Sequence, residues 1–129
     1  MTLSVTPLYA GLITLILWVL TVRVIRYRRA NKLSLGDTGD KALLKRMRAH
    51  SNLIEYAPLG LILILLAELQ GAPAFALHLM GSALLAGRLM HAIGFSQTPQ
   101  VMPLRVGGMA LTLMMLMVSA LGLIGHAIF

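Results

Sequence analysis

Residues 3–29 read LSVTPLYAGLITLILWVLTVRVIRYRR and decide the class of this protein. No charged side chain occurs from residue 3 to residue 22, and a basic run begins at Arg23. In a helix that rises ~1.5 Å per residue, about 20 apolar residues cross a hydrocarbon core of ~30 Å. The stretch therefore predicts a transmembrane helix. It carries no small-residue cleavage site, which indicates a retained span and not a signal peptide.

The composition of the whole chain agrees with a lipid environment. Only 12% of the 129 residues are charged and 58% are hydrophobic, whereas a soluble domain has about 25% charged residues. The absence of cysteine excludes a disulfide framework and a thiolate metal site. Nine of the eleven Lys and Arg residues lie between Arg23 and Arg48, so the net charge of +7 marks the ends of spans. We therefore expect no nucleic-acid partner.

Three further segments, at residues 53–69, 75–95 and 106–129, are long and apolar enough to cross a membrane. Gly71-Ala72-Pro73 alone separates the first two, which predicts a tight hairpin of antiparallel helices. Gly87 and Gly94, seven residues apart, indicate a close helix approach. We predict one all-α domain over residues 1–129, an integral membrane four-helix bundle. Its spans lie at about residues 3–29, 40–69, 73–96 and 104–127.

The distribution of Lys and Arg predicts the orientation of the bundle. The loop after the first span holds nearly all of the cations, and the hairpin at Gly71 holds none. Short loops rich in Lys and Arg face the cytoplasm. We therefore expect the basic loop and the loop at residues 97–103 to be cytoplasmic, with both termini on the opposite side.

Glu55, Arg88, His91 and Arg105 are ionisable residues that the topology does not explain. Charged groups among membrane helices are costly, so each is a candidate functional residue. The predicted topology places all four at the cytoplasmic ends of their helices. We expect Glu55 to be the single buried glutamate of this group.

Helical spacing places polar residues on one stripe of the second span. Successive residues turn by ~100° around a helix, and the stripe consists of Lys41, Lys45, Arg48, Asn52 and Glu55. Guanidinium, carboxylate and carboxamide groups together suit a small zwitterionic anion. The residues leave an alternative open, in which Glu55 pairs with Arg48 or Arg88 and no ligand is involved.

The run RMRAHSNLIEYAP at residues 46–58, followed by GRLMH at residues 87–91, resembles the MAPEG family. These are the membrane-associated proteins of eicosanoid and glutathione metabolism. The resemblance covers essentially the whole chain and implies a homotrimer of four-helix subunits. It also implies glutathione bound between neighbouring subunits near the cytoplasmic face. The chain is most similar to short bacterial members, so we expect it in the inner membrane.

The resemblance implies one catalytic arginine and a set of glutathione ligands. Arg105 would stabilise the glutathione thiolate, because a fixed cation lowers the pKa of a nearby thiol. The thiolate would attack a lipophilic electrophile or reduce a hydroperoxide, with glutathione as co-substrate and no metal. The implied glutathione ligands are Arg26, Arg48, Asn52, Glu55, Arg88 and His91.

Some positions leave a second function open. Eicosanoid synthases of the family carry hydroxyl residues where this chain has Phe95, Val106 and Met109. A non-catalytic lipid-binding or scaffold protein on the same fold is therefore the alternative. We expect no haem, because His78 and His91 lie ~220° apart around one helix at ~100° per residue.

Overall fold

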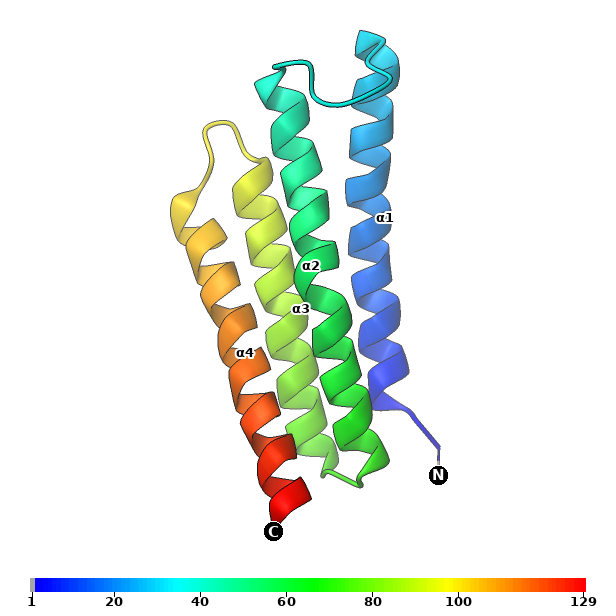
Figure 1. Ribbon diagram of the computed structural model, residues 1–129, viewed down its shortest axis with the longest axis vertical. Coiled ribbons are helices and arrows are strands. Elements are labelled where there is room, and N and C mark those ends of the chain that lie inside the picture. The colour runs from blue at the N-terminus through cyan, green and yellow to red at the C-terminus, as the bar shows by residue number, and fades with distance from the viewer. Residues whose placement is uncertain (1) are drawn as a thin grey trace.

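The computed structural model describes residues 2–129 and consists of four long helices (Figure 1). Each is long and apolar enough to span a membrane, which confirms the predicted all-α membrane fold. The helices are α1 (Val5–Asn31), α2 (Lys41–Leu69), α3 (Ala74–Ser96) and α4 (Met102–Ile128).

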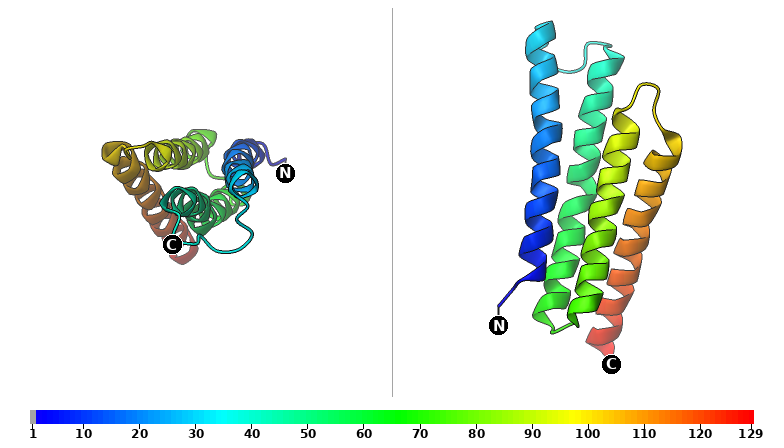
Figure 2. Two further views of the ribbon diagram at one scale, coloured as in Figure 1. Left: turned by 90° about the horizontal axis from the view of Figure 1, so that it is seen from above. Right: turned by 180° about the vertical axis from the view of Figure 1, so that it is seen from behind.

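The helices alternate in direction, so that both termini lie at the end of the bundle opposite the α1–α2 loop (Figure 1). Seen from above, α1 lies beside α2 and α3, and α4 packs against α3 and α2 (Figure 2). Among the described residues, α1 and α4 make no contact with each other. The bundle therefore has a face built from α2, α3 and α4 and another built from α1 and α3.

Hydrogen bonds at Asp40 join the end of α1 to the start of α2. Its Oδ1 atom accepts from the backbone N–H groups of Ala42 and Leu43, at 2.9 and 3.1 Å. The Tyr27 hydroxyl of α1 donates to Oδ2 at 2.8 Å. These hydrogen bonds, foremost the one from Leu43, hold the pKa of Asp40 below its ordinary value. The basic end of α1 is thus tied to the α2 N-terminus.

The buried glutamate of this bundle is Glu68, and our expectation that it would be Glu55 is wrong. Glu68 Oε1 accepts from the N–H groups of Ser4 and Val5 at 2.8 and 2.9 Å, and Oε2 accepts from that of Thr6 at 2.7 Å. The first N–H groups of a helix lack intrahelical partners and carry partial positive charge. Hydrogen bonds from these N–H groups therefore stabilise the buried carboxylate of Glu68. The Glu55 side chain is 48% exposed, because it lies on the outer face of α2.

The close helix approach that the spacing of Gly87 and Gly94 predicted is found between α3 and α4. A Cβ atom on Gly87 would lie 2.6 Å from Thr112 Oγ1, and one on Gly94 would lie 2.8 Å from the Val101 carbonyl oxygen. A Cβ on Gly108 of α4 would collide with the backbone nitrogen of His91. At these glycines the contact between α3 and α4 therefore has no room for a side chain.

We predict that Gly108→Ala destabilises the protein by about 1–3 kcal/mol, because the added methyl group meets backbone that cannot turn away. Gly122→Ala is the matched control in the same helix, since a Cβ there would have no atom of another helix within 4 Å. It should leave stability unchanged or raise it slightly. Thermal unfolding in detergent measures both variants. Equal melting temperatures for the two would contradict the close packing of α3 and α4.

Candidate functional site

The most buried charged side chain of the protein is Arg88, in the middle of the bundle. It is 1% exposed. Its Nε atom donates to Thr112 Oγ1 at 3.0 Å, and Nη1 donates to the side-chain Oδ1 of Asn52 at 2.6 Å. Its Nη2 atom lies 3.6 Å from Met109 Sδ. One guanidinium group therefore joins α2, α3 and α4, and all three of its nitrogens contact protein acceptors.

Arg88 also determines how Asn52 is oriented. A guanidinium group only donates hydrogen bonds, so the carboxamide oxygen of Asn52 must face it. The backbone carbonyl of Asn52 receives a second bond from Nη1, at 3.3 Å. The side-chain NH2 group of Asn52 is then directed away from Arg88. It offers two donors to a molecule beside α2.

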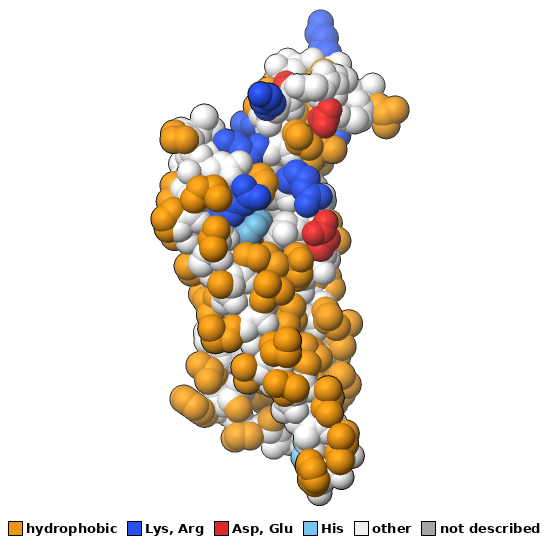
Figure 3. Space-filling view, turned by 60° about the vertical axis from the view of Figure 1, so that its left-hand side comes forward, with side chains coloured by type: hydrophobic (Ala, Val, Ile, Leu, Met, Phe, Trp, Pro, Cys, Tyr) orange, Lys and Arg blue, Asp and Glu red, His pale blue; other side chains and the backbone are white. Residues whose placement is uncertain are grey.

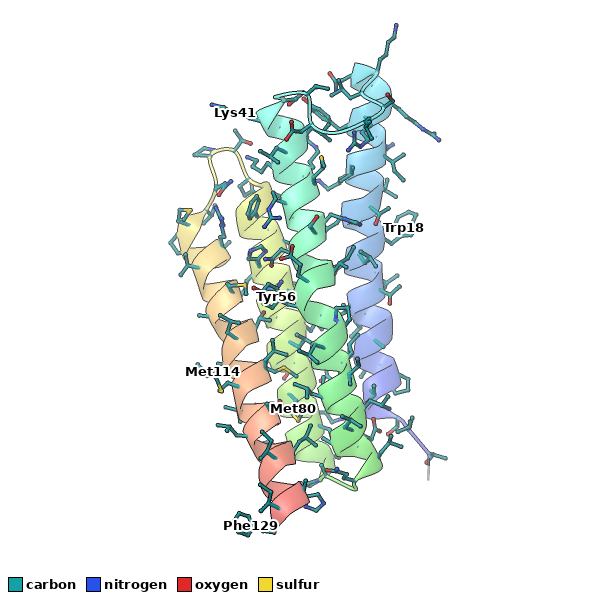
Figure 4. The ribbon with its side chains drawn as sticks, in the orientation of Figure 1. Trp18, Lys41, Tyr56, Met80, Met114 and Phe129 are labelled. Carbon is teal, nitrogen blue, oxygen red and sulfur yellow. The ribbon has the colours of Figure 1, made fainter. Side chains whose placement is uncertain are left out.

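A cavity of about 480 Å³ lies beside this cluster, between α2, α3 and α4. Asn52 and Tyr56 (labelled in Figure 4) line it from α2, His91 lines it from α3, and Arg105 and Met109 line it from α4. The structure thus brings three of the candidate residues, Asn52, His91 and Arg105, to one cavity.

Two contacts fix the position of Arg105. Its Nη1 atom donates to the side-chain Oε1 of Gln100 at 2.7 Å. Its guanidinium carbon lies 4.2 Å from the ring centroid of Phe95, within the range of a cation–π interaction. The Phe95 ring in turn lies 5.5 Å from that of His91. A partly buried, restrained cation therefore lines the cavity.

Arg48 and Glu55 form an ion pair on the outer face of α2, with Arg48 Nη1 and Glu55 Oε1 3.7 Å apart. Their side chains are 54% and 48% exposed, so the pair adds little stability. Of the two partners that the sequence left open for Glu55, the structure selects Arg48. Both side chains remain accessible to a ligand.

The other cations lie around the same end of the bundle. Figure 3 shows Lys and Arg side chains gathered at one end of this face, above a band of hydrophobic side chains. Arg48 lines a second cavity of about 490 Å³, together with Phe95. Arg26 is exposed on α1 and lines neither cavity. Within one chain, Arg26 therefore lies apart from the other candidates.

The family of the chain follows from comparison with known proteins. The model of the MAPEG family matches residues 6–125, which is nearly the whole bundle. The chain belongs to the MAPEG family. Over 91 residues it is 41% identical to the inner membrane protein YecN of Escherichia coli strain K12 and to YecN of Escherichia coli O6:H1 strain CFT073. The aligned part covers 70% of this chain and 70% of each relative.

Three residues of the candidate site did not emerge from the sequence: Tyr56, Gln100 and Thr112. Tyr56 follows Asn52 by four residues, so helical spacing alone could have placed it on the same side of α2. Gln100 lies in the α3–α4 loop, where no periodicity applies. Thr112 is found only from the packing of α3 on α4. Tyr56 supplies a hydroxyl group to a cavity that Val106 and Met109 line without one.

We predict that Thr112→Val lowers the free energy of unfolding by about 1–3 kcal/mol, because it leaves the buried Nε–H group of Arg88 without an acceptor. Thr14→Val is the matched control, since the Thr14 hydroxyl is exposed and bonds only the Ala10 carbonyl of its own helix. Thermal unfolding in detergent compares the two variants. The role given to Thr112 is wrong if both valine variants melt together with the parent protein.

Proposed function

We propose that this MAPEG protein binds glutathione beside Asn52 and Arg105 and activates its thiol. The thiolate would attack a lipophilic electrophile, or would reduce a hydroperoxide to an alcohol and water with a second glutathione, the two leaving as the disulfide. The observation that carries this proposal is the restrained Arg105 guanidinium, which lines a cavity together with a buried histidine and the Asn52 carboxamide. We also propose that the protein resides in the inner membrane, as the name of its relatives says of them.

The accessible charges complement the groups of glutathione. Its carboxylates suit the guanidinium groups, which bind a carboxylate through paired donors. Its ammonium group suits Glu55, the exposed glutamate. The Asn52 NH2 group is available for a peptide carbonyl oxygen, because Arg88 holds the carboxamide oxygen. Arg88 would then act on the ligand through Asn52, and it is a positioning residue in this proposal.

A homotrimer would complete this site. Arg26 lies on α1, and α1 makes no contact with α4 within the described part of one chain. A neighbouring subunit that placed its α1 against the α2–α4 face would bring its own Arg26 to the cavity. The proposed site is therefore shared between subunits.

The chemistry assigned to Arg105 is electrostatic. A thiol is a weak nucleophile until it loses its proton, and a fixed positive charge favours the anion. In conjugation, the proton leaves to water at the cavity mouth. The sulfur then forms a bond to an electrophilic carbon, and the displaced electron pair stays on the leaving group. The apolar part of that substrate would reach the cavity from the lipid.

We predict that glutathione raises the melting temperature of the detergent-solubilised protein, and that Arg105→Gln weakens glutathione binding by about tenfold, the effect of one lost charge-assisted contact. Arg29→Gln is the matched control, because Arg29 is exposed at the end of α1 and lines neither cavity. In ultraviolet titration, bound glutathione should form thiolate at a pH below that of free thiol in the parent protein. Arg105→Gln should reverse this shift.

The ligand itself provides a second control for this prediction. The diethyl ester of glutathione lacks both carboxylate charges, so it should produce little stabilisation. If the ester stabilises the protein as well as glutathione does, the pairing of carboxylates with arginines is wrong. Binding without any change in the thiol pKa would support the non-catalytic alternative and contradict the activation step.

A further inference from the structure

A groove separate from the proposed glutathione cavity runs between α1 and α3 and has a volume of about 370 Å³. Leu15 and Val19 line it from α1, and Leu89 and Ile93 line it from α3. At one end it is lined by polar side chains, among them Arg23. The groove therefore changes from apolar to basic along its length.

The change follows from helix direction and spacing. Leu15, Val19 and Arg23 are four residues apart and lie on one side of α1. Helices α1 and α3 run in the same direction, so Ser96 of α3 and Arg23 of α1 lie at the same end (Figure 1). The eight steps along the helix from Leu15 to Arg23 extend ~12 Å at ~1.5 Å per residue. The groove is long enough to hold part of an acyl chain below a polar head.

Beyond its polar end the groove meets a basic cavity of about 490 Å³. Arg23 and Ser96 line both spaces, and the second is also lined by Lys41, Arg46 and Arg48. Among the residues that the structure describes, no Asp or Glu lines either space. An anionic head group placed there would meet several cations and no like charge.

Two donors at the junction are free to bind such a head group. The Ser96 hydroxyl is buried and has no hydrogen-bond partner in the described part of the chain. The only ion pair among residues 2–129 joins Arg48 to Glu55, so the Arg23 guanidinium has no carboxylate partner there. Burying a polar group without a partner is costly, and phosphate oxygens would supply the missing acceptors.

We propose that the α1–α3 groove binds an anionic phospholipid of the bilayer, with an acyl chain along Leu15, Val19 and Ile93 and the phosphate at Arg23 and Ser96. A second copy of this chain is disfavoured as the occupant, because it would bring few acidic groups to Arg23 and Ser96: the chain has four Asp and Glu residues against eleven Lys and Arg. A zwitterionic lipid is disfavoured because no acidic side chain lines the groove to receive its ammonium group. An anionic lipid satisfies both conditions.

The test measures lipid retention in the intact protein. The full chain is reconstituted in vesicles with equal amounts of phosphatidylglycerol and phosphatidylcholine and extracted in mild detergent. Native mass spectrometry then counts the lipids that stay bound. We expect selective retention of phosphatidylglycerol, reduced about tenfold in Arg23→Gln. Arg29→Gln removes the same charge at the same end of α1 but outside the groove, so it should retain the lipid.

A second variant tests the groove without changing its charge. Val19→Trp fills the apolar part and should displace phosphatidylglycerol while the oligomeric state and the affinity for glutathione stay unchanged. Equal retention of the two lipids, or equal losses in Arg23→Gln and Arg29→Gln, would overturn the proposal in favour of unspecific charge attraction. Dissociation of the oligomer by Val19→Trp would overturn it in favour of a subunit contact. Glutathione binding is measured separately, so failure of the lipid site is distinct from failure of the proposed function.

Discussion

A guanidinium group buried inside a membrane bundle needs acceptors, and Arg88 finds them on helices that are distant in sequence. Asn52 of α2 and Thr112 of α4 accept its hydrogen bonds, and no carboxylate pairs with it among residues 2–129. This constraint fixes the rotation of three helices relative to one another. It also directs the NH2 group of Asn52 away from the cluster. This arrangement determines the shape of the cavity beside α4 and the hydrogen-bond donors that line it.

Helix α1 is held in place by other interactions and lines another face of the bundle. Glu68 accepts the N–H groups at its beginning, and Asp40 accepts the hydroxyl of Tyr27 near its end. Between these contacts α1 packs on α2 and α3 but leaves a groove on the outer side of the bundle. The proposed glutathione cavity and the proposed phospholipid groove therefore use different helix faces. They lie toward the same basic end of the bundle.

The sequence allowed the fold to be predicted because its signals are local. An apolar stretch of sufficient length defines each span, and the spacing of Gly87 and Gly94 indicates that another helix approaches α3 closely. The partners of polar residues depend on tertiary packing, and our prediction from the sequence was wrong for the buried glutamate. Glu55 and Glu68 have the same chemistry, yet only the placement of the α1 N-terminus shows that Glu68 is buried. Thr112 reaches Arg88 only through the rotation of α4.

The role of Arg88 is tested most sharply by an experimental structure of the protein with glutathione bound. We expect that Arg88 keeps its bond to the carboxamide oxygen of Asn52 and does not touch the ligand. The NH2 group of Asn52 and the guanidinium of Arg105 would contact glutathione instead. A structure in which Arg88 leaves Asn52 and binds a glutathione carboxylate would contradict the positioning role on which the site depends.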